Sequence, residues 1–208
     1  HARFTLGDRL ATEEQVLSHF GKGSDAQMRA GKLVIATQVA EQSLDADWDL
    51  VVSDLAPIDR LIQRAGRLQR HPRDLAGNRL MDAAGGDQRG APCLWVFGPE
   101  WVESPAEDWY KRILPRAARV YPHHGQLWLT AQVLQQGQIA LPDDARFLVE
   151  SVFGDLGDIP EALLASSGAA EGRALADRSE GQQNTIKLSS GYTADGTEWW
   201  SDARAPSR

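Results

Sequence analysis

The chain has 208 residues, 42% of them apolar, and this composition suits one or two globular domains with a sizeable core. Its formal net charge of −7 argues against nucleic-acid binding driven by bulk positive charge. Residues 1–80 carry 11 basic and 11 acidic side chains, whereas residues 81–208 carry 11 and 18. Any contact with a polyanion is therefore expected in the first part of the chain.

The cysteine content and the apolar runs exclude several classes of protein. Cys93 is the single cysteine, so an internal disulfide and a cysteine-rich zinc site are excluded. The sequence has no apolar run long enough for a membrane span and no signal peptide at its start, which predicts a soluble, cytoplasmic protein without membrane contact. Because the first residue is His1, we expect a fragment or a processed product.

In the first hundred residues the pattern alternates between helix and strand. Residues 1–4 are expected to be a strand remnant, and helical spacing predicts a helix from Asp8, its N-cap, to Phe20. The short sequence GKGS, 21–24, lacks the spacing of a phosphate-binding P-loop, and we interpret it as the end of this helix. Short β-rich runs then predict strands, and Pro57 predicts a helix start. The predicted strands and helix are 32–37, 49–54, 58–70 (helix) and 91–98. This order indicates an α/β fold with a parallel sheet.

The rest of the chain is predicted to be mainly helical. A surface loop over 74–91 precedes the third strand. Helical patterns cover 106–119, 124–136 and 142–153. Residues 154–184 are rich in Gly, Ala and Ser and are expected to form a flexible linker, and the alternating pattern after it predicts a hairpin.

The predicted helix 58–70 carries an unusual number of arginines. On a helical wheel, Gln63, Arg67 and Arg70 form one stripe, flanked by Arg60 and Arg64, with apolar residues on the opposite side. Like charges at this spacing repel one another, and guanidinium groups suit phosphate oxygens. Two interpretations stay open: a solvated amphipathic helix, or a phosphate site in which Arg64 is structural.

Other polar residues also have alternative interpretations. Thr37 ends a predicted strand, where its hydroxyl would cap the strand. Asp45, Asp47 and Asp49 would form a solvated loop or a cation site. His71 would cap the end of the helix.

Two motifs resemble those of a known enzyme family. Residues 63–70, QRAGRLQR, resemble motif VI of superfamily 2 helicases, and ATQVAEQSLD, 36–45, resembles their motif V. Together with HARFTLGDR at the start, the wording is similar to that of the CRISPR-associated helicase-nuclease of type I interference systems. The resemblance is strong over residues 1–71 and weaker beyond.

The resemblance implies a division of the chain. Residues 1–98 would be the second RecA-like lobe, an incomplete parallel sheet with flanking helices. A helical segment, 99–153, a flexible linker, 154–184, and a hairpin or the start of a C-terminal region, 185–208, would follow.

The resemblance also implies roles for individual residues. Arg67 and Arg70 match arginine fingers that reach the terminal phosphate of ATP, and Gln63 matches the residue that senses this phosphate or the attacking water. Asp45 matches the motif V acid linked to the nucleotide sugar. Thr37 matches a hydroxyl that contacts a DNA phosphate, and Arg9 lies where related helicases place an arginine against the DNA backbone. No metal ligand is assigned.

Several parts of the family's machinery are missing from this sequence. It has no P-loop, no Asp-Glu dipeptide for magnesium and no His-Asp dipeptide for the nuclease. ATP and Mg²⁺ would therefore be held mainly by a first lobe, and this chain would be inactive alone, as one motor lobe of an ATP-dependent helicase in antiviral defence. Its expected partners are single-stranded DNA, the guide-RNA effector complex, and the first lobe and nuclease domain of the same protein.

Two alternatives stand beside this role. The chain could be a non-catalytic fragment that binds DNA or the effector complex. It could also be a superfamily 2 helicase with another task, such as RNA remodelling, although the wording Glu-Gln-Ser-Leu-Asp at 41–45 argues against this.

Overall fold

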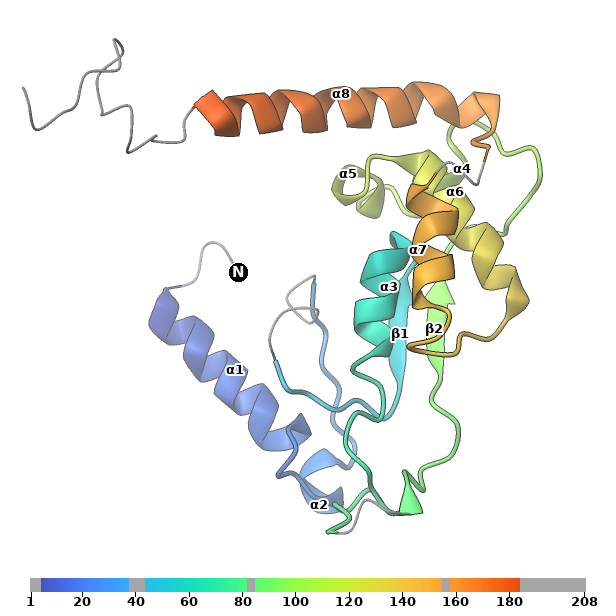
Figure 1. Ribbon diagram of the computed structural model, residues 1–208. Coiled ribbons are helices and arrows are strands. Elements are labelled where there is room, and N and C mark those ends of the chain that lie inside the picture. Colours follow the sequence, from blue (N-terminus) through green and yellow to red (C-terminus); the bar gives the residue numbers. More distant parts are fainter. Residues whose placement is uncertain (1–4, 38–43, 82–84, 155–157, 184–208) are drawn as a thin grey trace, which may run out of the picture.

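The computed structural model describes residues 5–37, 44–81, 85–154 and 158–183 (Figure 1). The predicted strand remnant 1–4, residues 38–43 of motif V and the predicted hairpin 185–208 lie outside these ranges. Within the described residues, no helix is long and apolar enough to cross a membrane.

The sheet consists of two parallel strands, β1 (Val51–Asp54) and β2 (Leu94–Phe97), with Val51 opposite Leu94. A parallel pair needs a crossover, and helix α3 (Ile58–Ala65) lies in it, against β1 (Figure 1). The α/β class and the parallel strands are confirmed. The β1 strand begins two residues later than predicted, and Asp49, which precedes it, pairs with Arg29 and Arg89.

The predicted strand 32–37 is wrong in this structure. These residues join no ladder, and a pocket lies between them and β1. The side chains of Leu33 and Ile35 are consequently exposed.

Helix α1 (Leu6–Phe20) begins two residues earlier than predicted, and its N-cap is Thr5 rather than Asp8. The Thr5 hydroxyl accepts a hydrogen bond from the Asp8 backbone and donates one to the Asp8 carboxylate, so Asp8 supports the cap instead of forming it. The predicted end at Gly21 is confirmed, and α2 (Ala26–Arg29) follows.

Short helices form the second part of the chain. They are α4 (Trp109–Ile113), α5 (Ala117–Val120), α6 (His124–Val133) with a 3₁₀ turn η3 (Leu134–Gln136), and α7 (Ala145–Phe153). The single helix predicted over 106–119 is wrong: Pro115 lacks an amide hydrogen and separates α4 from α5.

The predicted flexible linker is also corrected. Residues Glu161–Gln183 form one long helix, α8, which projects from the rest of the molecule (Figure 1). Leu163, Ser167 and Ala170 recur on one face and are buried where α8 packs against α6, whereas 171–181 are exposed. Packing of the first turns therefore overrides the helix-weakening effect of the glycines. The division of the chain into domains stays a prediction.

One apolar core joins the two parts. It collects buried residues from the end of β1, from α3 and from the later helices. The core residues are Leu55, Ala56, Ile58, Leu61, Trp109, Tyr110, Leu127, Trp128, Leu129, Ala131, Leu148, Val152 and Leu163. The Tyr110 hydroxyl donates a hydrogen bond of 2.6 Å to the carbonyl oxygen of Leu55, which ties α4 to the end of β1.

We expect Gly125→Ala to lower the free energy of unfolding by about 1–3 kcal/mol, the usual cost of overpacking. A β-carbon at Gly125 would lie 2.6 Å from Ser167 Oγ and 2.7 Å from Ile159 Cγ2, where α6 meets α8. Gly172→Ala is the matched control, because no described atom beyond the nearby helix backbone lies within 4 Å of its β-carbon, and it should stabilise α8 slightly. Urea unfolding measures both; equal stability of Gly125→Ala and wild type would contradict this packing.

A pH dependence follows from His124. Burial lowers the pKa of its imidazole, a hydrogen bond with the backbone of Ala118 opposes this, and the charges of His123 and Lys111 lower it further. The unfolded chain therefore binds more protons, and the contribution of His124 to stability is lost as the pH falls through its unfolded value of about 6.5. We expect His124→Asn to reduce the slope of unfolding free energy against pH between about 5 and 7. Identical slopes for the two proteins would contradict the expectation.

Candidate nucleotide and nucleic-acid site

The arginine motif does not lie on one helix. Helix α3 ends at Ala65, Gly66 is its C-cap, and Gln69 has a left-handed backbone with φ of 44°. The predicted helix 58–70 and its stripe of Gln63, Arg67 and Arg70 are therefore wrong in geometry. Backbone hydrogen bonds to Trp48 draw the chain away from the helical path after residue 66. Gln63 is exposed on the last turn of α3, and the two arginines follow on the turn beyond it.

Arg64 has a structural role. Its guanidinium donates hydrogen bonds to Ser53 Oγ and, at 3.3 Å, to the carbonyl oxygen of Asp54 on β1. It also donates one of 2.9 Å to the hydroxyl of Tyr121, just beyond α5. Arg64 thus joins helix α3 to strand β1 and to the helical part of the chain. These contacts agree with the interpretation of Arg64 as a structural residue.

Arg70 is held by a local carboxylate. Its Nε lies 2.9 Å from Asp45 Oδ1, and the same oxygen lies 3.1 Å from His71 Nε2. We expected guanidinium groups awaiting a phosphate, so this ion pair departs from that expectation. The pair is about half exposed, with relative side-chain accessibilities of 42% and 52%. His71 contacts the same acid and does not cap α3, which ended earlier.

Arg67 is the more enclosed of the two arginines. Burial lowers the pKa of its guanidinium, the positive charge of Arg70 lowers it further, and Asp45 opposes both effects. The structure therefore brings Asp45, Arg67 and Arg70, three predicted site residues, into one electrostatic cluster.

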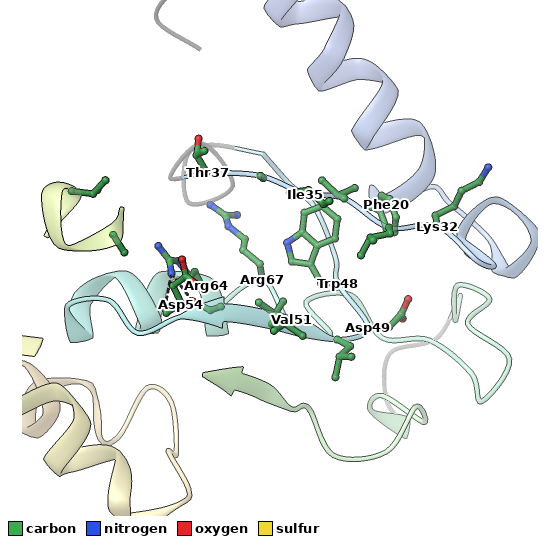
Figure 2. Close-up of a pocket in the computed structure, with 18 of the residues that line it drawn as sticks. Phe20, Lys32, Ile35, Thr37, Trp48, Asp49, Val51, Asp54, Arg64 and Arg67 are labelled. Atoms are coloured by element: carbon green, nitrogen blue, oxygen red, sulfur yellow. Dashed lines mark hydrogen bonds between the residues drawn. The ribbon is translucent and has the colours of Figure 1, made fainter. Parts of the chain in front are cut away.

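A pocket of about 700 Å³ lies between the extended segment 32–37 and β1 (Figure 2). Figure 2 shows the side chain of Arg67 reaching across it toward Thr37, while Trp48 and Phe20 line another part of the wall. Thr37 is thus placed near the arginine motif. Arg9 is not: it lies on α1, pairs with Glu13 at 3.2 Å and does not line this pocket.

A buried ion-pair network, which the sequence interpretation missed, lies behind the motif. Asp47 is fully buried and contacts three guanidinium groups, those of Arg29, Arg73 and Arg89. Arg73 is also fully buried and donates to the backbone carbonyls of 21, 24 and 77. The alternating acids at 45, 47 and 49 were the available signal, since buried acids require cations.

Arg89 extends the network to the surface. It donates 2.6 Å hydrogen bonds to Asp49 and Asp87. Burial lowers the pKa of the Arg89 guanidinium, but its hydrogen bonds to three carboxylates raise it overall. For Asp87 the directions are opposite: burial raises the pKa of its carboxyl group, and the hydrogen bonds from Arg89 lower it overall.

The described residues do not fit a magnesium ion. No group of three His, Cys, Asp or Glu side chains that could hold a metal occurs within the described ranges. The aspartates at 45, 47 and 49 instead bind arginines, which exclude a cation.

Comparison with known proteins agrees with this arrangement of motifs. Residues 1–73 match the family model described as CRISPR-associated nuclease/helicase Cas3, C-terminal. The chain is 51% identical over 158 residues to a CRISPR-associated endonuclease/helicase Cas3 of Escherichia coli, covering 74% of this chain and 15% of that protein. A Cas3 of Thermus thermophilus is 33% identical over 190 residues, which is 90% of this chain and 18% of the relative.

This chain belongs to the Cas3 helicase family. It corresponds to a C-terminal-side region of Cas3 and spans less than a fifth of the length of these two relatives. The crystal structure of T. fusca Cas3-ATP matches with a TM-score of 0.66 and 35% identity, over 90% of this chain and 20% of that one. A chain of a CRISPR RNA-guided surveillance complex, pre-nicking, matches with a TM-score of 0.59 and 33% identity, over 87% and 20%.

We expect Arg64→Ala to lower the free energy of unfolding by about 2 kcal/mol, because charge-assisted hydrogen bonds to β1 and Tyr121 are lost. Arg60→Ala is the matched control on the same helix, where the side chain is 45% exposed and the change should cost less than about 1 kcal/mol. Urea unfolding compares them, and equal losses would contradict the structural role of Arg64.

Proposed function

We propose that this Cas3 segment is the second motor lobe of an ATP-dependent helicase-nuclease that moves along single-stranded DNA in CRISPR interference. Arg67 and Arg70 would supply positive charge to the terminal phosphate of an ATP molecule held by a first lobe. The observation that carries the proposal is the clustering of these two guanidiniums beside Asp45 on the turn after α3; burial, and then the charge of Arg70, lower the pKa of Arg67. Two clustered cations favour an anion with several oxygens, such as a phosphate group.

The ion pair between Arg70 and Asp45 gives the site a resting state. Their distance of 2.9 Å and partial exposure let an incoming phosphate compete for the guanidinium. Asp45, released from Arg70, would then turn to the nucleotide sugar, and Gln63, exposed at the end of α3, would face the phosphate or the attacking water. Thr37 would contact the phosphate backbone of DNA, and Arg9 would do so only if α1 lies beside the DNA path.

The missing elements define the partners. A P-loop and a magnesium carboxylate would come from the first lobe of the same protein, together with the nuclease domain. Mg²⁺ would be held there, since Asp45, Asp47 and Asp49 of this chain bind arginines. The ATP named with one structural relative and the surveillance complex named with another support ATP as the nucleotide and a guide-RNA effector complex as a partner.

ATP turnover tests this proposal. The chain is mixed with a separately produced first lobe and single-stranded DNA, and phosphate release is measured. We expect turnover that falls by roughly 10³–10⁵ in Arg67→Ala and in Arg70→Ala, the range lost with arginine fingers in related hydrolases. Arg173→Ala, on the exposed part of α8, removes the same charge and should leave turnover unchanged.

Two results would contradict the proposal. One is wild-type turnover that survives both substitutions. The other is DNA binding without turnover under any condition, which would favour the alternative of a non-catalytic module that binds DNA or the effector complex.

A further inference from the structure

The backbone of Trp48 holds the turn that carries the arginine fingers. Its amide donates a hydrogen bond of 2.9 Å to the carbonyl oxygen of Arg67, and its carbonyl oxygen accepts one of 2.9 Å from the amide of Gln69. These two bonds bracket Leu68, which lies between the two bonded residues. Trp48 is therefore the template on which the chain turns after α3 ends.

This turn needs external support because its backbone is unusual. Gln69 has a positive φ of 44°, a conformation that costs energy for a residue with a side chain. A residue in that region persists only where its surroundings fix it. The hydrogen bond from Gln69 to Trp48 supplies part of that constraint.

Trp48 is itself fixed through both of its neighbours. Asp47 lies before it, fully buried against Arg29, Arg73 and Arg89. Asp49 lies after it and accepts hydrogen bonds or ion pairs of 2.8 Å from Arg29 and 2.6 Å from Arg89. The ion-pair network thus fixes the residues on each side of Trp48, whose backbone holds the turn.

The same network reaches the far side of the fingers. Arg89 donates a hydrogen bond of 3.0 Å to the carbonyl oxygen of His71, the residue after Arg70. Arg70 consequently lies between two supported residues, Gln69 and His71. The network joins the guanidiniums of 29, 73 and 89 to the carboxylates of 47, 49 and 87, so its charge is balanced.

We propose that Asp47 is a positioning residue for Arg67 and Arg70, acting through the backbone of Trp48. Because its side chain is fully buried, it would contact neither ATP nor DNA itself. Its buried carboxylate holds the 47–49 segment against three guanidiniums, and this segment sets where the two fingers emerge. The consequence for catalysis rests on the function proposed above, whereas the geometric claim does not.

Amide hydrogen exchange on the chain alone tests the geometry. The reporters are the amides of Trp48 and Gln69, and Leu148 in the core of α7 is the reference for global unfolding. In Asp47→Asn we expect both reporters to exchange at least about tenfold faster relative to the reference, since their local opening is no longer coupled to the network. Asp87→Asn is the matched control: it removes a carboxylate from the same network but leaves the 47–49 segment intact.

A second variant covers the case in which Asp47→Asn does not fold. Asp49→Asn removes the acid on the other side of Trp48, and because its side chain is 48% exposed, the fold should tolerate the change. It should speed exchange of the same two amides by a smaller factor. Exchange at Trp48 and Gln69 that matches Asp87→Asn, in whichever variants fold, overturns the proposal.

Turnover with the first lobe adds the catalytic consequence. In Asp47→Asn we expect kcat per folded molecule to fall on the order of 10- to 100-fold with the KM for ATP nearly unchanged, as displaced catalytic groups produce. Asp87→Asn should keep its kcat. Equal kcat values in the two variants overturn the catalytic part of the proposal, whereas an inactive wild type counts against the proposed function and leaves the exchange result to decide the geometry.

Discussion

The first part of the chain depends on one buried carboxylate, that of Asp47. A buried charge costs several kcal/mol unless it is paired and its remaining oxygens are hydrogen-bonded, and here three guanidiniums meet that condition. Those arginines come from distant segments. Their ion pairs with Asp47 therefore hold α2, the loop after motif V and the loop after motif VI close together. These ion pairs hold the segments together beside a sheet that has two strands among the described residues.

The helical part is built differently, from apolar contacts. Leu127, Leu148 and Leu163 are fully buried on three successive helices, and hydrogen bonds link this part to the sheet and to α3. One joins Tyr110 to the end of β1, and another joins Arg64 to Tyr121. Helix α3 contributes Ile58 and Leu61 to the apolar core, and the turn after it is hydrogen-bonded to Trp48, so the arginine motif receives support from both parts.

The sequence predicted what depends on local chemistry. Gly21 ends α1 and Pro57 precedes α3, because capping and proline geometry act within a few residues. The residues of motifs V and VI also predicted the family that the comparisons found. The end of α3 could not be predicted, since it depends on Trp48, which lies in a separate segment of the chain before β1. The burial of Arg73 and Arg89 could not be predicted either, because both bind Asp47, which lies in a separate segment of the chain.

The exposed face of the sheet explains why the strand 32–37 was predicted and then not found. Val52 and Trp95 are partners in the parallel ladder and point to the same side, where they are 69% and 62% exposed. Parallel strands are normally covered on both faces, so their sequences are apolar on both. The apolar composition of 32–37 is typical of a strand inside such a sheet. A segment of this kind forms a strand only where a neighbouring strand supplies hydrogen bonds. An apolar pattern therefore predicts the tendency to form a strand, whereas the ladder depends on a partner strand. Among the described residues, the segment 32–37 has no such partner, because the pocket lies between it and β1.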